Sequence, residues 1–399
     1  MIHITIVPVT EAAVDLASPA VFNYNFYIST NPEVVNAGIH DEAAAKHHWL
    51  QHGIGMGLQA SGNFHSMQYL ARYKDIRDSL GAHSYQQAVE HYLTNGIHEH
   101  RLGYVEGGFE GRWTVSDSKH QLHVSASNRM GAAVDSVVWN NKEFINAWDH
   151  GRELQMAMNF SPNGECFNPT EAGGRDDFQA ATTHTVIKSV LAHGNTLETT
   201  VHPAFWLRPH AREAGHGNKV CHNGTLAMNT DPTYRHPFSK VVTLSCPGVT
   251  TPCITYESTF TIAGHIPDYT TLQMEAPTGY MTREFTKYQS VAPRTGHMTH
   301  LSNRLPLVMS TQDDHYAMGI YAPPDQDTDL YQYYGTFNFS HLRYPAASSN
   351  KWNVVYRKHT FASGSTHVQQ YRAYICVGTV HDVQGCINSL LKTHENLIG

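Results

Sequence analysis

Charged residues are scarce in this sequence. Only 15% of its 399 residues are Asp, Glu, Lys or Arg, whereas about 25% is usual for a soluble domain. The formal net charge is −7 with neutral histidines, and no run or stripe of Lys and Arg occurs. Because nucleic-acid backbones are bound by clustered positive charge, a nucleic-acid partner is not expected. The polar surface must come from Ser, Thr, Asn, Gln, Tyr and His, which is typical of β-rich, often secreted proteins.

Long apolar runs and familiar catalytic motifs are also missing. No stretch of about 18 apolar residues occurs, so no membrane-spanning helix is predicted. The first ten residues, MIHITIVPVT, show no signal peptide. The sequence has no Gly-x-Ser-x-Gly elbow, Walker loop, dinucleotide fingerprint, His-Glu-x-x-His or Cys-x-x-Cys. Serine hydrolases, nucleotide enzymes, zincins and zinc ribbons are therefore disfavoured, and no cofactor or metal ligand is predicted.

Histidine, by contrast, is abundant. The 29 histidines outnumber the 27 Lys and Arg residues, so the net charge is expected to change sign as the pH falls; the alternative is that they are ordinary polar surface groups. Two groups hold several potential metal ligands, namely 98–100 and the set His210, His216, Cys221 and His222. Neither has an established metal spacing, so a metal ion and a His-rich metal-dependent oxidoreductase are kept only as alternatives.

The cysteines are few for the length of the chain. The six are Cys166, Cys221, Cys246, Cys253, Cys376 and Cys386. Six cysteines in so long a chain do not make a disulfide scaffold, so the redox compartment stays open. Cys246 and Cys253 flank the turn sequence Pro-Gly-Val-Thr-Thr-Pro and are placed to form a disulfide across it.

The first hundred residues contain an internal repeat. The segment 27–34 recurs at 69–76, and 48–54 recurs at 91–97, with an offset that moves from 42 to 43 residues. Each unit predicts two short helices, the second ending at a glycine, Gly53 or Gly96. Helix pairs this short cannot bury their apolar faces alone, so the units must stack on each other or on the next domain. We expect a helical repeat domain over 1–107, with self-association through the repeats as one role.

This repeat resembles the short repeats appended to secreted bacterial proteins, which read roughly Tyr-Leu-x-x-Tyr-Pro-Asp-Leu to His-Tyr-x-x-x-Gly-x-x-Glu-Gly-Arg. The second unit keeps Tyr69, Asp75, His91, Tyr92, Gly96 and Arg101. It departs from the pattern at Lys74, where Pro is usual, and at His100, where Gly is usual. The resemblance implies a secreted or periplasmic protein.

The pattern of residue types in the sequence changes after residue 107. From about Trp113, short β-branched and aromatic runs alternate with turn residues, and no helix-length periodic run separates them. The missing βαβ alternation predicts antiparallel sheets packed face to face over 108–399. Only the tail from Val380 has helical spacing, and it is expected to cap one end of the sandwich. In size and strand texture this domain resembles the supersandwich of galactose-mutarotase-like and polysaccharide-lyase proteins.

The densest polar cluster runs from residue 149 to 177, as two Gly-containing loops on either side of the apolar strand 154–160. Its mixture of His, Arg, Glu and Asn is suited to a carbohydrate site with acid–base chemistry. The alternative is that Asp149/Arg152 and Glu171/Arg175 are ion pairs that fix the loops. A seven-residue strand spans about 23 Å, so the loops can meet only if the chain after residue 160 folds back.

The predicted roles are as follows. His150 or His202 abstracts or relays a proton, Arg152 neutralises a substrate carboxylate, and Glu165 or Glu171 is the opposite acid or base. Asn168, Arg175, Trp206 and Tyr280 are the predicted substrate-binding residues. Trp206 is equally compatible with a core position, and the aromatic run 331–334 adds further candidate sugar contacts.

The resulting hypothesis is a carbohydrate-active protein that binds a saccharide or polysaccharide in a concave groove of the sandwich. As an enzyme it would be a lyase or epimerase, or a glycoside hydrolase that uses Glu165 and Glu171 as its pair. The contrasting class is a non-catalytic lectin or surface-assembly protein.

Overall fold

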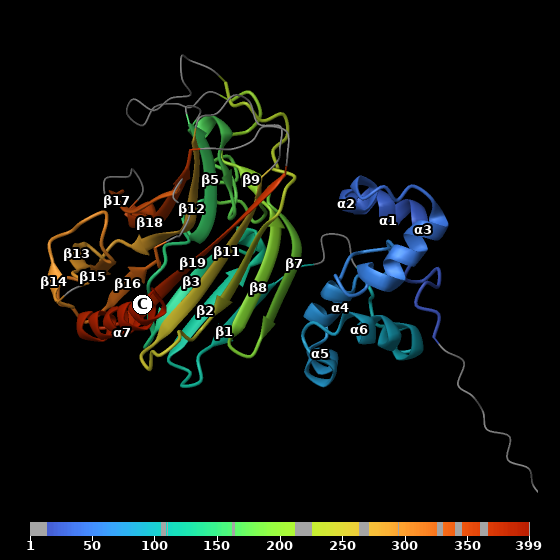
Figure 1. Cartoon of the computed structure of the whole chain (residues 1–399), viewed down its shortest axis with the longest axis horizontal. Coiled ribbons are helices and arrows are strands. Elements are labelled where there is room, and N and C mark those ends of the chain that lie inside the picture. Colours follow the sequence, from blue (N-terminus) through green and yellow to red (C-terminus); the bar gives the residue numbers. More distant parts are fainter. Residues whose placement is uncertain are drawn as a thin grey trace, which may run out of the picture. The chain divides into compact units, whose positions relative to one another are not determined.

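The computed structural model describes residues 14–104, 109, 111–161, 164–211, 226–262, 271–293, 295–324, 330–339, 345–359 and 366–398. The chain forms two compact units, Met1–Gly108 and Phe109–Gly399. The first is helical and coloured blue to teal in Figure 1, and the second is built mainly of strands.

The helical unit repeats the same elements twice. The first copy contains α1 (Tyr24–Thr30), α2 (Pro32–Asn36), α3 (Glu42–His48) and the helical turn η1 (Trp49–Gly53). The second contains α4 (Ser66–Arg72), α5 (Lys74–Leu80), α6 (Tyr85–His91) and η2 (Tyr92–Gly96). The sequence repeat is therefore also a repeat of secondary structure.

The same hydrogen bond between two repeated residues, a tyrosine and a histidine, occurs in both copies. The Tyr27 hydroxyl lies 2.8 Å from His48 Nδ1, and the equivalent Tyr69 hydroxyl lies 2.9 Å from His91 Nδ1. Each tyrosine is fully buried, so its hydroxyl needs such a partner. The glycine that ends each repeat lies against the same hydroxyl and leaves no room for a Cβ atom.

The two copies differ at their ends. Gly57 closes the first copy with a left-handed φ of +67°, and His100 takes the equivalent position with φ 56°. In the second copy, Arg101 donates to both oxygens of Asp75, at 3.2 and 2.9 Å, and lies 4.8 Å over the Tyr73 ring. Arg101, which follows His100, thus fixes the end of the second copy, whereas the first copy has Leu58 at the equivalent position.

The second unit is a sandwich of two large antiparallel sheets, and this confirms the predicted fold class. The ten-stranded sheet has the order β1 (Arg112–Ser116), β2 (Leu122–Ser127), β3 (Val134–Trp139), β5 (Leu154–Ser161), β12 (Thr271–Thr282), β18 (Ser349–Lys358), β17 (Leu330–Asn338), with β4 (Lys142–Glu143), β6 (Pro169–Thr170) and β9 (Ala204–Phe205) beside this path.

The nine-stranded sheet lies in front of it in Figure 1. Its order is β14 (Met298–Thr299), β13 (Lys287–Val291), β15 (Leu307–Ser310), β16 (Ala317–Tyr321), β19 (His367–Gly378), β11 (Cys253–Ile262), β10 (Phe238–Thr243), β8 (Thr196–His202), β7 (Val186–His193).

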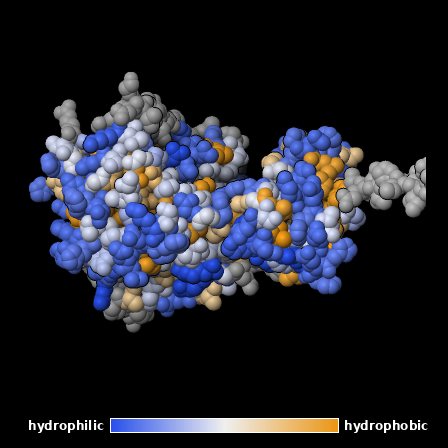
Figure 2. Space-filling model, turned by 90° about the horizontal axis from the view of Figure 1, so that it is seen from below, coloured by the Kyte–Doolittle hydropathy of each residue, from blue (hydrophilic) through white to orange (hydrophobic). Residues whose placement is uncertain are grey.

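Alternation along the strands builds the core. In β11 and β18 the residues of one parity, such as Tyr256, Phe260, Trp352 and Tyr356, are buried between the sheets. Residues of the other parity form the outer face of each sheet, the face turned away from the partner sheet. The surface seen in Figure 2 is mostly hydrophilic to neutral in colour, with hydrophobic residues in small separate patches.

Helix α7 (Val380–Ile398) packs on β16 and β19 with Val383, Ile387 and Leu390 buried. Two disulfides lie in the same apolar cluster, Cys376–Cys386 and the Cys246–Cys253 bridge across the turn. No helix in the part of the chain that the structure describes is long and apolar enough to cross a membrane.

Candidate functional site

The two polar loops meet because the chain folds back along β5. After the turn at Gly164, Thr170 pairs with Ala157 of β5, and Glu171 donates its amide to the Met156 carbonyl at 3.0 Å. The returning segment reaches the first loop, where the amide of His150 donates to the Phe178 carbonyl at 2.8 Å. Proximity of the loops does not, however, bring all the predicted catalytic side chains together.

Glu171 points into the interior between the sheets. Its carboxylate is 0% exposed and pairs with the ammonium of Lys240, which also donates to the Ala132 carbonyl and the Thr199 hydroxyl, both at 2.7 Å. Burial raises the pKa of Glu171 and lowers the pKa of Lys240, against the attraction between the two charges. A group sealed in this way has no contact with a substrate from solvent, and its partner is Lys240 instead of Arg175.

His150 is also enclosed. Its Nδ1 and Nε2 lie 2.7 and 2.6 Å from the backbone carbonyls of Phe178 and Arg129. Carbonyls only accept, so both hydrogen bonds form together only when the ring carries two protons. His202 lies elsewhere, at the end of β8 in the nine-stranded sheet, where burial and then Lys188 lower its pKa to about 4.

Arg152 makes the ion pair with Asp149 that the sequence suggested as an alternative, with Nε 2.5 Å from Oδ1. It also donates to the Ala347 carbonyl at 3.2 Å. The next residue, Glu153, is 0% exposed, and within the described parts of the chain neither of its carboxyl oxygens has a hydrogen-bond partner. Burial, and then the Asp149 charge, raise the pKa of Glu153 well above its usual range.

The remaining predicted residues lie on the returning segment and beside it. Asn168 donates to Glu165 Oε2 at 2.8 Å, and its backbone carbonyl accepts from the amide of Trp206. Trp206 is half-buried and covers Gly151, while Arg175 lies 3.8 Å from Asp176 and is about one third exposed. These residues mainly contact one another, so their side chains fix the conformation of the loops and do not form a surface for stacking a sugar ring.

The outer face of the ten-stranded sheet carries a different polar group. Tyr280 of β12, Lys351 of β18 and Phe337 of β17 are direct neighbours across three strands. Lys351 Nζ lies 2.9 Å from the Glu275 carboxylate, which also accepts from Asn353 Nδ2 at 2.8 Å. We call Glu275, Tyr280, Lys351 and Asn353 the outer cluster.

Arg152 and Glu165 act on this cluster through their charges. The pKa of Lys351 is raised because Glu275, Tyr280 and Glu165 together outweigh its burial. Burial raises the pKa of Tyr280, while Lys351 and Arg152 oppose that rise. Of the predicted residues, Tyr280 belongs to the outer cluster itself, while Arg152 and Glu165 are near enough for their charges to act on Tyr280 and Lys351, respectively.

An aromatic strip runs beside the outer cluster along the edge strand β17. Tyr331, Tyr333 and Phe337 share the outer face, and Gly335 between them leaves room for the side chain of Asn353. Phe337 is 47% exposed and Tyr331 is 37% exposed. Large aromatic groups in a row on an exposed edge are unusual unless they contact a partner.

Two arginines border the strip. The Arg304 guanidinium lies 4.0 Å over the Tyr331 ring, and that of Arg357 lies 5.0 Å over Tyr333. Arg357 donates to Gln273 Oε1 at 2.8 Å, and Arg304 donates to the Gln332 carbonyl at 3.2 Å. Among the described residues neither arginine has a carboxylate partner.

Sequence reasoning missed Glu275, Lys351, Arg304 and Arg357 because it searched the loops. The available signal was alternation within a strand. In β18 the sequence Lys-Trp-Asn-Val-Val-Tyr-Arg places its polar residues at every second position except one, which puts them on one face of the sheet. Polar groups on the exposed side of a predicted strand are common, so this signal has little specificity without the neighbouring strands.

The proposed metal ligands are mostly untested by the structure, because His216, Cys221 and His222 lie outside the described residues. Three sulfur atoms of Cys253, Cys376 and Cys386 lie within 4.8 Å of one another. All three cysteines are in disulfides, so they cannot offer thiolates to a metal.

Comparison with known proteins gives distant likenesses only. No protein-family model matches the chain, and no curated protein sequence is similar to it. A heparan sulfate lyase, HepC from Pedobacter heparinus, is 8% identical with a TM-score of 0.34, and the match covers 88% of this chain and 50% of that one. A heparinase III is 9% identical with a TM-score of 0.33, covering 79% and 42%.

A 4-alpha-glucanotransferase from Thermococcus litoralis is 6% identical, with a TM-score of 0.29 and coverage of 92% and 57%. The chain spans about half the length of the heparan sulfate lyases. Because these identities and TM-scores are so low, the function proposed below rests on the side chains of the outer face and not on the likeness.

Proposed function

We propose that the outer face of the ten-stranded sheet binds a saccharide that carries acidic groups. The observation that supports this most directly is the aromatic strip of Tyr331, Tyr333 and Phe337 bordered by Arg304 and Arg357. Aromatic rings pack against the CH-rich faces of sugar rings, and guanidinium groups form paired hydrogen bonds with carboxylates or sulfates.

The charge balance of this face favours an anionic ligand. Lys351 is paired with Glu275, and Arg152 is paired with Asp149, so these cations are already neutralised. Arg304 and Arg357 contact only neutral groups within the described residues. A ligand with carboxylate or sulfate groups spaced along the strip would supply the missing counter-charges.

Removal of the aromatic surface tests the proposal. The double variant Tyr333→Ala/Phe337→Ala is expected to bind a uronate hexasaccharide, such as hexagalacturonate, at least about tenfold more weakly, because two ring contacts are lost. Val368→Ala is the matched control, since Val368 is 57% exposed on the outer face of the other sheet. Equal titration-calorimetry affinities for the parent and the double variant would rule out this surface as the site.

A lyase is the second candidate function, and the position of Tyr280 favours it. Its phenol lies beside Lys351, and the charges of Lys351 and Arg152 both lower its pKa against the effect of burial. As a phenolate, Tyr280 can take the proton from the carbon next to the uronate carboxylate, and as the phenol it can return that proton to the leaving glycosidic oxygen as the C–O bond breaks and the C=C bond forms, while an arginine of the strip neutralises the carboxylate. Tyr280→Phe should then abolish release of unsaturated uronates while leaving hexasaccharide binding within about threefold, a loss smaller than one hydrogen bond.

Within this proposal Glu171, His150 and His202 have no catalytic role, because the first two are enclosed and the third belongs to the other sheet. A protein that binds the hexasaccharide and releases no unsaturated product would be a lectin with the same binding face.

We further propose that the protein is secreted or periplasmic. The disulfides Cys246–Cys253 and Cys376–Cys386 support this location, because disulfides persist in oxidising compartments. Fractionation of producing cells, followed by thiol alkylation without reduction, is expected to find the protein outside the cytoplasm with these cysteines unmodified. Fully alkylated cytoplasmic protein would contradict the proposal.

A further inference from the structure

The outer face of the nine-stranded sheet has a regular polar surface of another kind. In one row across four strands, Thr200, Ser239, Thr259 and Gln370 are successive cross-strand neighbours. The Thr200 and Ser239 hydroxyls lie 2.9 Å apart, within hydrogen-bonding distance. Strands lie about 4.8 Å apart, so hydroxyl and amide groups recur at that interval across the sheet.

The adjacent row carries an ion pair beside the hollow, and its fourth member, Glu198 of β8, contacts His193. Here Val241, Glu257 and Arg372 are cross-strand neighbours, and Arg372 Nη2 donates to Glu257 Oε1 at 2.6 Å. The pair keeps both charges on the surface, where side chains of 54% and 41% exposure remain open to a ligand. Unlike Arg304 and Arg357, this arginine already has its counter-charge.

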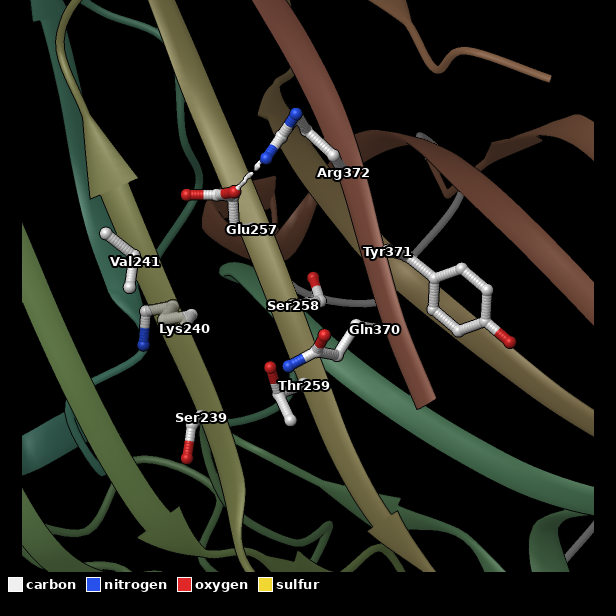
Figure 3. A pocket seen from close by; sticks show the side chains of 9 residues that line it. All are labelled: Ser239, Lys240, Val241, Glu257, Ser258, Thr259, Gln370, Tyr371 and Arg372. Atoms are coloured by element: carbon white, nitrogen blue, oxygen red, sulfur yellow. Dashed lines mark hydrogen bonds and ion pairs between the residues drawn. The ribbon is translucent and has the colours of Figure 1, made fainter. Parts of the chain in front are cut away.

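A hollow lies where the two rows meet. Figure 3 shows Ser239, Thr259 and Gln370 at one side of it, and the Glu257–Arg372 pair joined by a dashed line at the other. The hollow is an open depression with a volume of about 430 Å³, within the range of about 300–1,000 Å³ that is usual for small-molecule sites. Lys240 and Tyr371 also border it, but they point into the interior, toward Glu171 and Tyr356.

We propose that this hollow is a second binding site, specific for a neutral, hydroxyl-rich saccharide. Two hydroxyls, one amide and a charge-balanced pair offer donors and acceptors in nearly equal number, which matches sugar hydroxyls that both donate and accept. The absence of an unpaired charge among the outward-facing residues of the hollow gives no reason to prefer an anion. This site is independent of the acidic-saccharide site on the other sheet.

The test uses the full chain and two probes, a neutral hexasaccharide of glucose and hexagalacturonate. Thr259→Trp fills the hollow and is expected to weaken binding of the neutral probe at least about tenfold through steric exclusion. Val368→Trp is the matched control, because it adds the same side chain to the same outer face, outside the residues that line the hollow. Circular dichroism checks that both variants are folded.

Gln370→Ala provides a second reading that does not depend on a large side chain, since Gln370 is exposed and its loss leaves the core unchanged. This variant should also bind the neutral probe more weakly, by about threefold to tenfold, because one neutral hydrogen bond is removed. Absence of neutral-probe binding to the parent, or equal affinity in Thr259→Trp and the parent, would overturn the second site. A response of hexagalacturonate alone would overturn the assigned ligand class. Failure of the proposed function is judged separately, by Tyr333→Ala/Phe337→Ala with hexagalacturonate.

Discussion

The two outer faces of the sandwich share one architecture and differ in chemistry. On the ten-stranded sheet the outward positions hold aromatic rings and arginines without carboxylate partners, in the part of the chain that the structure describes. On the nine-stranded sheet the corresponding positions hold hydroxyls, an amide and the Glu257–Arg372 pair. The strands themselves are alike, so ligand preference is set by every second residue and not by the fold.

The interior pair beneath both faces gives the largest expected effect. Glu171→Gln leaves the buried ammonium of Lys240 without a counter-charge, which should destabilise the protein by about 3–5 kcal/mol. Urea unfolding followed by circular dichroism measures the loss. Binding at both faces should weaken only to the extent that protein unfolds, in contrast to surface variants that affect one face.

A double variant serves as the control for this pair. Glu171→Gln/Lys240→Met removes both charges and should recover most of the stability lost in the single variant. A Glu171→Gln protein of parental stability that no longer binds or turns over saccharide would show that Glu171 contacts substrate, contrary to the buried position.

Salt should separate the two faces. Raising the ionic strength from about 0.01 M to 0.15 M shortens the Debye length from about 30 Å to 8 Å, so binding of hexagalacturonate should weaken severalfold. Binding of the neutral hexasaccharide should not change, because its site carries a paired charge. Calorimetric titrations at both salt concentrations provide the comparison, and an equal salt dependence would remove the distinction between the faces.

Glu153, which lies beside the ten-stranded sheet, should make the free energy of unfolding depend on pH. Burial raises the folded pKa of this carboxyl well above its usual 4.5. A raised carboxyl pKa stabilises the fold at pH values below the unfolded pKa, and this contribution is lost as the pH rises through the folded pKa. Glu153→Gln keeps the shape and should increase the free energy of unfolding at pH 7 but not at pH 4. If the difference in unfolding free energy between variant and parent, measured by urea unfolding, were the same at pH 4 and pH 7, this prediction would be contradicted.

The smallest effect concerns His202 on the nine-stranded side. Its pKa is lowered to about 4, first by burial, so its ring should stay neutral between pH 7 and 5. A lowered histidine pKa contributes stability above the unfolded value of 6.5, and this is lost as the pH falls toward 4. Two-dimensional NMR of the imidazole nitrogens, with His202→Gln for assignment, follows the titration. A midpoint near 6.5 would contradict the burial argument.

Much of the fold could be predicted from sequence, because local patterns carry it. The repeat of Tyr27 and His48 at Tyr69 and His91 encodes the same hydrogen bond twice. Alternation and the missing βαβ pattern indicate antiparallel sheets, and the turn between Cys246 and Cys253 indicates their disulfide. Each of these signals lies within a few residues or within one repeat.

The site was less predictable because it depends on strand order. Tyr280 was predicted, yet Lys351 lies beside it only because β12 and β18 are neighbours. The fate of Glu171 depends on Lys240, sixty-nine residues away. A sequence shows that a carboxylate is flanked by glycines, but not which sheet face or which distant cation it meets.

The most direct test of the central claim is the affinity of hexagalacturonate for the double variant Arg304→Gln/Arg357→Gln. Both arginines contact only neutral groups within the described residues, so their replacement removes no ion pair there. Binding should fall by about 150-fold or more, since each of the two charged hydrogen bonds contributes about 1.5–3 kcal/mol, while binding of the neutral hexasaccharide stays unchanged. Undiminished affinity for hexagalacturonate in this folded variant would contradict an acidic-saccharide site on the ten-stranded sheet.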